Sequence, residues 1–185
     1  MSVEATISSA KDMMNKAINH LEVELVKIRT GKATPSMLDS VMVEYYGAMT
    51  PLQQIANVNT PDARTIVIQP WEKNKLQDIE RAIINSNLGL APQNDGSIIR
   101  ITVPPLTEER RKDMVKIAKA QGEDTKVGIR NARRDALEQI KKLQKDGLSE
   151  DEAKDLEAKI QQITNEYIAK VDEHVAKKEK EILTL

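Results

Sequence analysis

Positively charged side chains recur at helical spacing in the third quarter of the chain. Between residues 110 and 134 there are nine Lys or Arg and three acids, although the whole chain has a net charge of −1. Seven of these bases fall on one side of a predicted helix, because an α-helix turns by about 100° per residue. This basic stripe consists of Lys112, Lys116, Lys119, Lys126, Arg130, Arg133 and Arg134. We expect it to bind a polyanion, since arginine in particular offers bidentate hydrogen bonds to phosphate.

The basic stripe also has an explanation without a binding role, because the solvated flanks of coiled coils carry rows of charge too. Two features favour a binding surface. Acids do not alternate with the bases, as they usually do on a solubilising face, and arginine is concentrated at positions 130, 133 and 134. The alternative stays open as a structural or chaperone-like coiled-coil adaptor, in which the basic stripe is incidental.

The same predicted helix has a second series of residues at steps of three and four. This small-residue seam consists of Val115, Ala118, Gly122, Thr125, Ile129, Ala132 and Ala136. Its centre lies about 100° around the helix from the basic stripe. Such a seam is typical of helices that pack as a coiled coil, and small side chains let the partner helices approach closely. We therefore expect the seam to be buried and the bases to face water.

Apolar periodicity predicts three long helices in all. They cover residues 3–29, residues 106–145 and the segment after residue 149. Gly31 is expected at the C-terminal cap of the first helix, and Ser149 with Glu152 forms a capping box at the start of the third. The stretches 106–145 and 146–185 have net charges of +5 and −5, which favours antiparallel pairing of the last two helices.

Residues 36–103 differ in pattern and predict a compact α+β unit. The expected elements are strands at 41–46, 65–69 and 97–103 and an amphipathic helix at 73–87. The expected apolar side of that helix is Leu76, Ile79, Ile83 and Ile84. The expected core is Ile55, Val58, Ile66, Ile68, Ile99, Ile101 and Val103. Tyr45 and Tyr46 should divide between core and surface, and Trp71 should pack over the unit.

These elements predict the α+β fold class, as a long three-helix bundle with an inserted small β/α/β domain. Residues 1–30 and 106–185 form the bundle, and residues 31–105 form the inserted domain. Pro and Gly in both connections favour a defined elbow, and two thin connections permit hinge rotation between two arms of an elongated, angled molecule. The elbow residues from this argument are Thr30, Gly31, Lys32, Pro35, Pro104 and Pro105.

Several functional classes find no support in the residues. There is no Cys, no phosphate-binding glycine motif and no metal-ligand spacing around the two histidines. We therefore expect no cofactor, no metal and no catalytic residue, and an enzyme is the least favoured class. The first residues lack the basic and apolar regions of a secretory signal, and no apolar run reaches the roughly 18 residues of a membrane span. The expected location is cytoplasmic, without a membrane partner.

Four segments of the chain resemble the bacterial ribosome recycling factor family, and the resemblance spans essentially its whole length. The segments are KIRTGKATPSMLDSVMVEYYGAMTPLQQIANV (27–58), DARTIVIQPWEK (62–73), PPLTEERRKDMVKIAK (104–119) and VGIRNARRDA (127–136). The resemblance implies an L-shaped form with the size of a transfer RNA. It also implies a non-enzymatic translation factor that, with elongation factor G and GTP, dissociates the post-termination ribosome into subunits and releases it from messenger RNA.

The resemblance also implies partners and contact residues. The partners are the ribosomal RNA of the large subunit and elongation factor G, with no DNA, and the protein is expected to be a monomer. The family's RNA-contacting arginines fall on Arg130 and Arg133, with Arg134 next to them. This agrees with the basic stripe, because A-form RNA is recognised mostly through its shape and backbone. Arg110 and Arg111 match a pair at the elbow end of the family's bundle.

The first elbow connection also matches the family, with one departure. Arg29 and Gly31 match family positions there, so Arg29, Arg110 and Arg111 join the expected elbow residues. At position 32 the common family residue is Arg, whereas this chain has Lys32. The positive charge is kept but the bidentate geometry is lost, so Lys32 can attract a phosphate only as a point charge.

Overall fold

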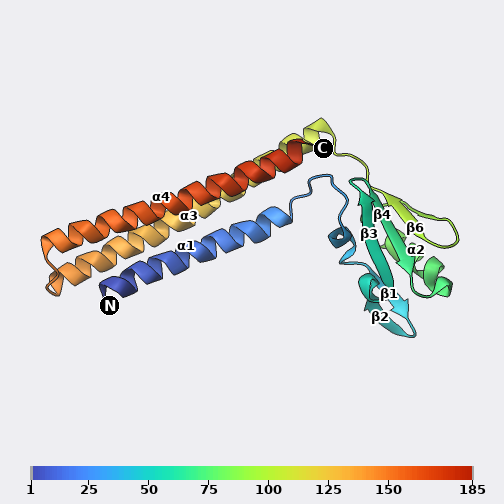
Figure 1. The fold of residues 1–185 in the computed structure, drawn as a ribbon, viewed down its shortest axis with the longest axis horizontal. Helices are drawn as coiled ribbons and strands as arrows, with labels where there is room; N and C mark the ends of the chain where they lie inside the picture. Colours follow the sequence, from blue (N-terminus) through green and yellow to red (C-terminus); the bar gives the residue numbers. More distant parts are fainter. Residues whose placement is uncertain (1, 185) are drawn as a thin grey trace. The chain divides into compact units, whose positions relative to one another are not determined.

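The computed structural model describes residues 2–184, and the chain divides into two compact units (Figure 1). One unit joins the residues up to Thr30 with Glu108–Thr184. The other unit is Gly31–Thr107. Each unit has its own hydrophobic core. Helices and strands are both present, and the predicted α+β class is confirmed.

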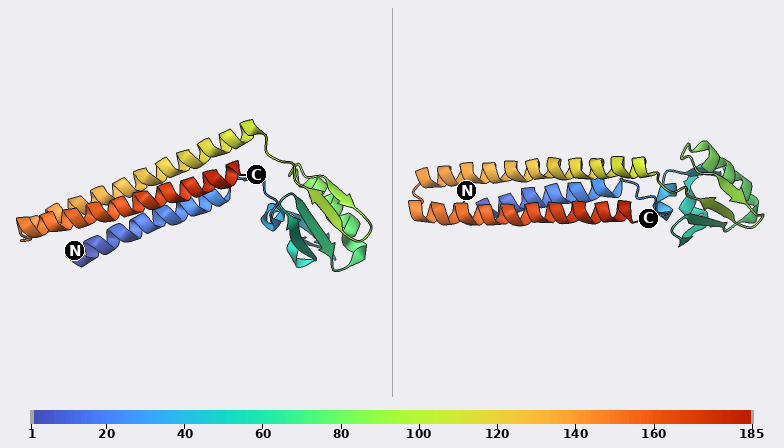
Figure 2. Two further views of the ribbon diagram at one scale, coloured as in Figure 1. Left: turned by 45° about the horizontal axis from the view of Figure 1, so that its top comes forward. Right: turned by 90° about the horizontal axis from the view of Figure 1, so that it is seen from above.

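The first unit is a three-helix bundle. Its helices are α1 (Val3–Val26), α3 (Glu108–Lys145) and α4 (Glu150–Leu183). The views in Figures 1 and 2 agree that α3 runs antiparallel to both α1 and α4. At 1.5 Å per residue, the 38 residues of α3 extend for about 57 Å. The core follows the whole bundle as a line of mostly aliphatic side chains rather than as a compact centre.

The break between α3 and α4 follows the predicted turn chemistry. Gly147 has φ +115°, and the N–H groups of Gly147 and Leu148 donate to the carbonyl oxygens of Gln144 and Leu143. This is a Schellman motif, which satisfies the last carbonyls of α3. The Ser149 side chain then accepts from the N–H of Glu152, whose carboxylate accepts from the N–H of Ser149. The predicted capping box is confirmed.

The prediction for the end of the first helix is wrong by three residues. The helix ends at Val26, and its cap is Lys27, in a right-handed conformation. Ile28 continues the apolar series and is buried, which explains why periodicity alone extends the helix too far. Gly31 does have a positive φ of +82°, but it lies in the connection after the helix rather than at its cap.

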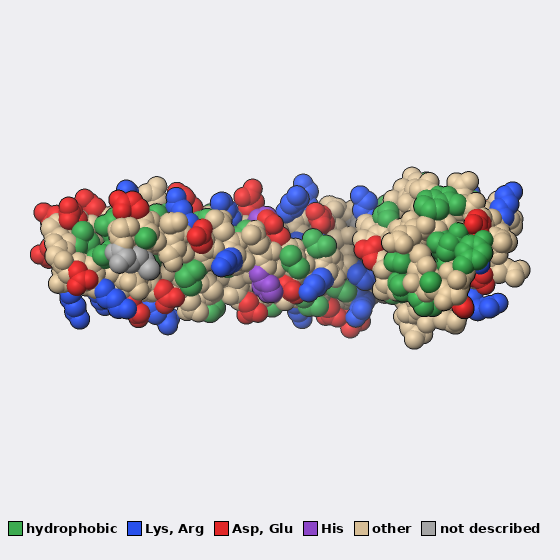
Figure 3. All heavy atoms as spheres, turned by 90° about the horizontal axis from the view of Figure 1, so that it is seen from below, with side chains coloured by type: hydrophobic (Ala, Val, Ile, Leu, Met, Phe, Trp, Pro, Cys, Tyr) green, Lys and Arg blue, Asp and Glu red, His purple; other side chains and the backbone are tan. Residues whose placement is uncertain are grey.

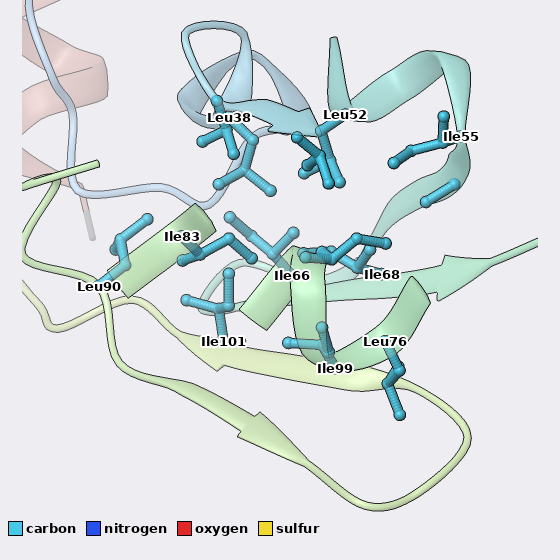
Figure 4. Close-up of a cluster of buried hydrophobic side chains, with 14 of the residues drawn as sticks. Leu38, Leu52, Ile55, Ile66, Ile68, Leu76, Ile83, Leu90, Ile99 and Ile101 are labelled. Carbon is cyan, nitrogen blue, oxygen red and sulfur yellow. The ribbon is translucent and has the colours of Figure 1, made fainter. Parts of the chain in front are cut away.

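The second unit contains a four-stranded antiparallel sheet in the order β3-β4-β6-β5 and a separate β1-β2 hairpin. The strands are β1 (Met42–Tyr45), β2 (Ala48–Pro51), β3 (Ala56–Asp62), β4 (Thr65–Pro70), β5 (Pro92–Asn94) and β6 (Ile99–Thr102). Helix α2 spans Leu76–Asn85, and short 3-10 turns cover Pro35–Leu38, Leu52–Gln54 and Lys73–Lys75. Alternate residues of β4 and β6 are buried on one face of the sheet and join the core with α2 (Figure 4).

Three strands were not predicted, and their composition explains why. β2, β3 and β5 contain Pro51, Pro61 and Pro92, and proline is unfavourable inside a sheet. All three strands lie at an edge of their sheet, where a missing N–H can face away from the ladder.

The turn between β1 and β2 has a positive φ at both Tyr46 and Gly47. This is the geometry of a tight two-residue hairpin, so β1 ends before Gly47.

Three side chains of this unit are less buried than the sequence predicts. Ile84 is 58% exposed, because it points about 100° away from the buried Ile83 on α2. Trp71 is 68% exposed and does not pack over the unit. Its backbone N–H donates to the carbonyl of Ile55, which holds the main chain at the end of β4 while the indole faces water. Among the expected core residues, Val58 is only half-buried.

Candidate nucleic-acid interface

The burial of the small-residue seam determines which way the basic stripe faces on α3. Six of its seven members are buried against α1 and α4, and Val115 is half-buried. The fit is close at Gly122, where an added Cβ would lie 2.6 Å from Cγ2 of Val175 on α4. The packing fixes the rotation of α3 about its axis, and therefore fixes which bases can reach a partner.

The basic stripe separates into two rows. The outward row consists of Lys112, Lys116, Arg130 and Arg134, and all four residues are exposed. Lys112 pairs loosely with Glu108 of its own helix, at 4.0 Å. No ion pair is found for Arg130 or Arg134 within residues 2–184. These two arginines can therefore present their guanidinium groups to a phosphate without first giving up a partner.

The inner row consists of Lys119, Lys126 and Arg133, which are spaced by seven residues and lean toward α4. Lys119 Nζ lies 3.9 Å from a carboxylate oxygen of Glu179. Lys126 Nζ lies 2.6 Å from Oδ1 of Asp172 and 3.5 Å from Oε1 of Glu123. The expectation that the whole stripe faces water is therefore wrong for part of this row. Arg133 and Lys126 are half-buried against the neighbouring helix.

Lys126 is the base most strongly held within the bundle. Its hydrogen bond to Asp172 raises the pKa of the Lys126 ammonium above its ordinary value. Its side chain is only 16% exposed. A phosphate would have to compete with two carboxylates for this ammonium group. Sequence could not show this, because the Asp172 contact depends on the register between α3 and α4.

One further base continues the outward row beyond the predicted stripe. Lys141 is exposed and lies seven residues after Arg134 on α3. Val127 lies seven residues before Arg134 on the same line along α3, so this line also carries an apolar side chain, which is 53% exposed. Lys141 lies 11 residues after Arg130, and therefore about 20° around the helix from it, so helical spacing alone identifies it as a member of this side of α3.

The elbow residues of the second unit are joined to one turn of its sheet. The N–H of Ala33 donates to the carbonyl of Ala63 at 2.8 Å, and the N–H of Val103 donates to the carbonyl of Arg64 at 2.7 Å. A Cβ added to Gly31 would lie 3.2 Å from Cγ of Leu106. The two connecting segments are therefore held side by side at the β3-β4 turn. Lys32, Pro35, Pro104 and Pro105 are exposed around them.

The remaining predicted elbow residues belong to the bundle unit or to its end. Arg29 and Arg110 are exposed, Thr30 is half-buried, and Arg111 is half-buried at the first turn of α3. The Nε of Arg111 is buried without a hydrogen-bond partner in the described part of the chain. A hinge role for these residues stays a prediction.

A polar aromatic cluster on the second unit was not predicted. The hydroxyls of Tyr45 and Tyr46 donate to the two carboxylate oxygens of Glu72, at 2.9 and 2.8 Å. These hydrogen bonds lower the pKa of Glu72, and the same carboxylate raises the pKa of both tyrosines. Lys75 Nζ lies 4.5 Å from the ring centre of Tyr46. Figure 3 shows exposed hydrophobic side chains gathered on this unit, while acidic and basic groups intermingle along the bundle.

Neither a metal-binding cluster nor a membrane-spanning helix is found within residues 2–184. No group of three or more His, Asp or Glu side chains is arranged to hold a metal ion in that range. None of the helices described there combines the length and the apolar character needed to cross a bilayer.

Comparison with known proteins covers nearly the whole chain. The model of the family described as ribosome recycling factor matches residues 21–183. The ribosome-recycling factor of Porphyromonas gingivalis is 52% identical over 186 residues and covers 100% of both chains. That of Flavobacterium johnsoniae is 53% identical over 181 residues, which cover 98% of this chain and 97% of the relative.

Two solved structures are similar over the same length. A solution structure of a ribosome recycling factor is 37% identical, with a TM-score of 0.74, over 100% of this chain and 99% of that one. The second describes the T. thermophilus ribosome recycling factor and the E. coli elongation factor G bound to the E. coli post-termination complex. It is 50% identical, with a TM-score of 0.62, over 99% of this chain and 100% of that one.

Proposed function

The chain belongs to the ribosome recycling factor family, and from that premise we propose its function and the surface that performs it. It is a translation factor that binds the post-termination ribosome. With elongation factor G and GTP it dissociates the ribosome into subunits and releases it from messenger RNA. The function requires no catalytic group of its own. A relative of 50% identity is described on a post-termination complex together with elongation factor G.

The outward row of α3 is the proposed contact with the ribosomal RNA of the large subunit. The observation that carries this proposal is that Arg130 and Arg134 are exposed and unpaired within residues 2–184 on a helix fixed by its seam. Lysine and arginine that neutralise phosphates release bound counterions, which supplies affinity without reading bases. The positive potential of this surface is increased by the other exposed bases of the row, Lys112, Lys116 and Lys141. The inner row lies along its edge, with Lys119, Lys126 and Arg133.

The Gly31–Thr107 unit is the proposed arm that faces elongation factor G. Its support is the exposed Tyr46 of the aromatic cluster, together with the exposed Trp71, because exposed aromatic side chains are typical of protein interfaces. The connections on either side of this unit, from Arg29 to Pro35 and from Pro104 to Arg111, are the proposed hinge. The protein is expected to act as a monomer in the cytoplasm.

Ribosome binding by arginine variants tests the RNA surface. Arg130→Ala and Arg133→Ala should each lose about 2 kcal/mol of binding free energy, the value of a charge-assisted hydrogen bond. Neither residue belongs to the seam, so each should cost less than about 1 kcal/mol of folding stability. Cosedimentation with ribosomes at several salt concentrations measures the first effect, and thermal unfolding measures the second.

The matched control is Lys159→Ala. Lys159 is an exposed base of the same bundle, about 160° around α4 from the side that meets the inner row. It loses the same charge without touching the basic stripe, so its ribosome affinity should stay close to that of the wild type. Equal affinities for the wild type, the control and the double Arg130→Ala/Arg133→Ala variant would refute the proposed surface.

A further inference from the structure

The three bases of the inner row meet different chemical groups on α4. Lys119 and Lys126 each meet a carboxylate, from Glu179 and Asp172. Arg133 meets a neutral amide instead, because its Nε donates to Oε1 of Gln161 at 2.8 Å. Two of the three charges are therefore compensated within the bundle, whereas Arg133 keeps its full positive charge.

The amide that meets Arg133 is itself oriented by its own helix. Nε2 of Gln161 donates to Oδ1 of Asn165, one turn later on α4, at 2.9 Å. Residues four apart on a helix are neighbours, so this bond fixes the direction of the Gln161 side chain. It leaves Oε1 of Gln161, the atom that Arg133 uses, pointing toward α3. The three residues form a directional chain from α4 to the guanidinium group.

The hydrogen bond to Gln161 occupies the Nε side of the Arg133 guanidinium and leaves the side with the two terminal nitrogens available. Nε is used by Gln161, and the two terminal nitrogens have no partner in residues 2–184. An arginine binds an anion oxygen pair through its two terminal nitrogens as well as through Nε and one of them. When Nε of Arg133 is held by Gln161, the guanidinium can offer an anion only its two terminal nitrogens, and it offers them in a fixed direction.

We propose that Gln161, held by Asn165, is a positioning residue that aims Arg133 at a phosphate of ribosomal RNA. The inference rests on the proposed function, since it assigns a new role at the same surface. A neutral acceptor suits this role better than a carboxylate, because it orients the side chain without cancelling the charge that attracts the phosphate. Gln161 itself need not touch the RNA.

A purely structural role for the chain of hydrogen bonds is a weaker explanation. Gln161 and Asn165 are both exposed, and the α3–α4 contact beside them is made by buried residues such as Ile160 and Ile163. An exposed hydrogen bond exchanges with water and adds little to folding stability. Unfolding experiments should therefore hardly distinguish Gln161 variants from the wild type.

The test measures ribosome affinity and its salt dependence for two substitutions at Gln161. Gln161→Glu keeps an acceptor but neutralises Arg133, and should weaken binding about tenfold and reduce the salt slope by about one contact. Gln161→Met keeps the volume but removes the acceptor. It should weaken binding less than Gln161→Glu, because the charge of Arg133 is retained.

The matched control is the neighbouring residue Gln162, which is also exposed on α4. Gln162→Glu adds the same charge about 100° around the helix and should leave affinity within about twofold of the wild type. A second control uses Arg133→Ala as the background. Because Gln161 acts through Arg133, Gln161→Glu should have no further effect in that background.

The outcomes separate this inference from the proposed function. If Arg130→Ala and Arg133→Ala weaken binding and Gln161→Glu does no more than Gln162→Glu, the positioning role is overturned and the surface stands. A full effect of Gln161→Glu in the Arg133→Ala background would also overturn it. If neither arginine variant weakens binding, the RNA surface is wrong, and the positioning role falls with it.

Discussion

At the scale of single residues, the hydrogen bonds around Glu72 tie the β1-β2 hairpin to the end of β4. The carboxylate accepts from Tyr46 and Tyr45, which lie 26 and 27 residues away in the chain. The ammonium group of Lys75 lies over the face of the Tyr46 ring, and the ring attracts this positive charge. Such attraction is stronger where the cation is partly removed from water. The cluster therefore holds the exposed ring of Tyr46 in place beside the half-buried ring of Tyr45.

The pH dependence of this cluster can be predicted at both ends of the scale. The pKa of Glu72 is lowered, so its contribution to stability is present above the ordinary glutamate pKa and is lost as the pH falls through the lowered value. The pKa values of Tyr45 and Tyr46 are raised, so their contribution is present below about pH 10 and is lost as the pH rises through the raised values.

Replacing the carboxylate should shift the tyrosine titration. In Glu72→Gln, Tyr45 and Tyr46 should ionise at lower pH than in the wild type, because the negative charge that opposes their ionisation is gone. Ultraviolet absorbance of tyrosinate during an alkaline titration measures this shift. Glu44→Gln, at an exposed acid of β1, is the control and should leave the titration unchanged. Coincident titrations of the wild type and Glu72→Gln would show that the cluster is not formed in solution.

At the scale of the elements, two glycines of α3 should respond in opposite ways to the same substitution. Each costs about 1 kcal/mol relative to alanine in a helix interior. At Gly128 the nearest neighbour of an added Cβ is Cβ of Ala17, at 3.9 Å, whereas at Gly122 it is Cγ2 of Val175, at 2.6 Å. Valine is stiff at χ1, so Val175 cannot easily turn away.

The expected results differ in sign. Gly128→Ala should stabilise the protein by about 1 kcal/mol, through helix propensity. Gly122→Ala should destabilise it by about 1 kcal/mol, because overpacking between α3 and α4 exceeds the gain in propensity. Urea denaturation of the two variants gives both values. Equal stabilisation by the two substitutions would mean that α3 and α4 are not closely packed at Gly122.

The elements show where sequence reasoning succeeds and where it does not. Long helices are predictable because Ala118, Ile129 and their neighbours repeat a local spacing over many turns. Strands β3 and β5 are not predictable from composition, because pairing with β4 and β6 overrides the poor propensity of Pro61 and Pro92. Trp71 looks like a core residue by type, and only the direction of the chain after Pro70 shows that it is exposed.

The candidate site follows the same division. The heptad spacing of Lys112, Lys119, Lys126 and Arg133 predicts a common side of α3, and the structure brings the last three of them together beside α4. Spacing within one helix cannot predict contacts between helices, however. Asp172 lies 46 residues after Lys126, and only the register of α4 brings its carboxylate to 2.6 Å. The partition into an outward and an inner row is therefore a result of tertiary packing.

At the scale of the whole molecule, we propose that the bundle binds the ribosome and that the Gly31–Thr107 unit responds to elongation factor G. The bundle contains every residue of the basic stripe, and the Gly31–Thr107 unit has a separate core. Binding and splitting should therefore respond to different substitutions. Changes in the outward row should lower the affinity for ribosomes, and their effect on splitting should be overcome by adding more protein.

Subunit splitting of post-termination ribosomes tests this claim most directly, with the wild type, Arg130→Ala/Arg134→Ala and Lys159→Ala compared across a range of protein concentrations. With elongation factor G and GTP, the wild type and Lys159→Ala should split ribosomes at the same low concentration, and neither should do so without elongation factor G. The double arginine variant should need several hundredfold more protein, if each arginine makes one charge-assisted contact of about 2 kcal/mol. Splitting by the double variant at the wild-type concentration would contradict the account.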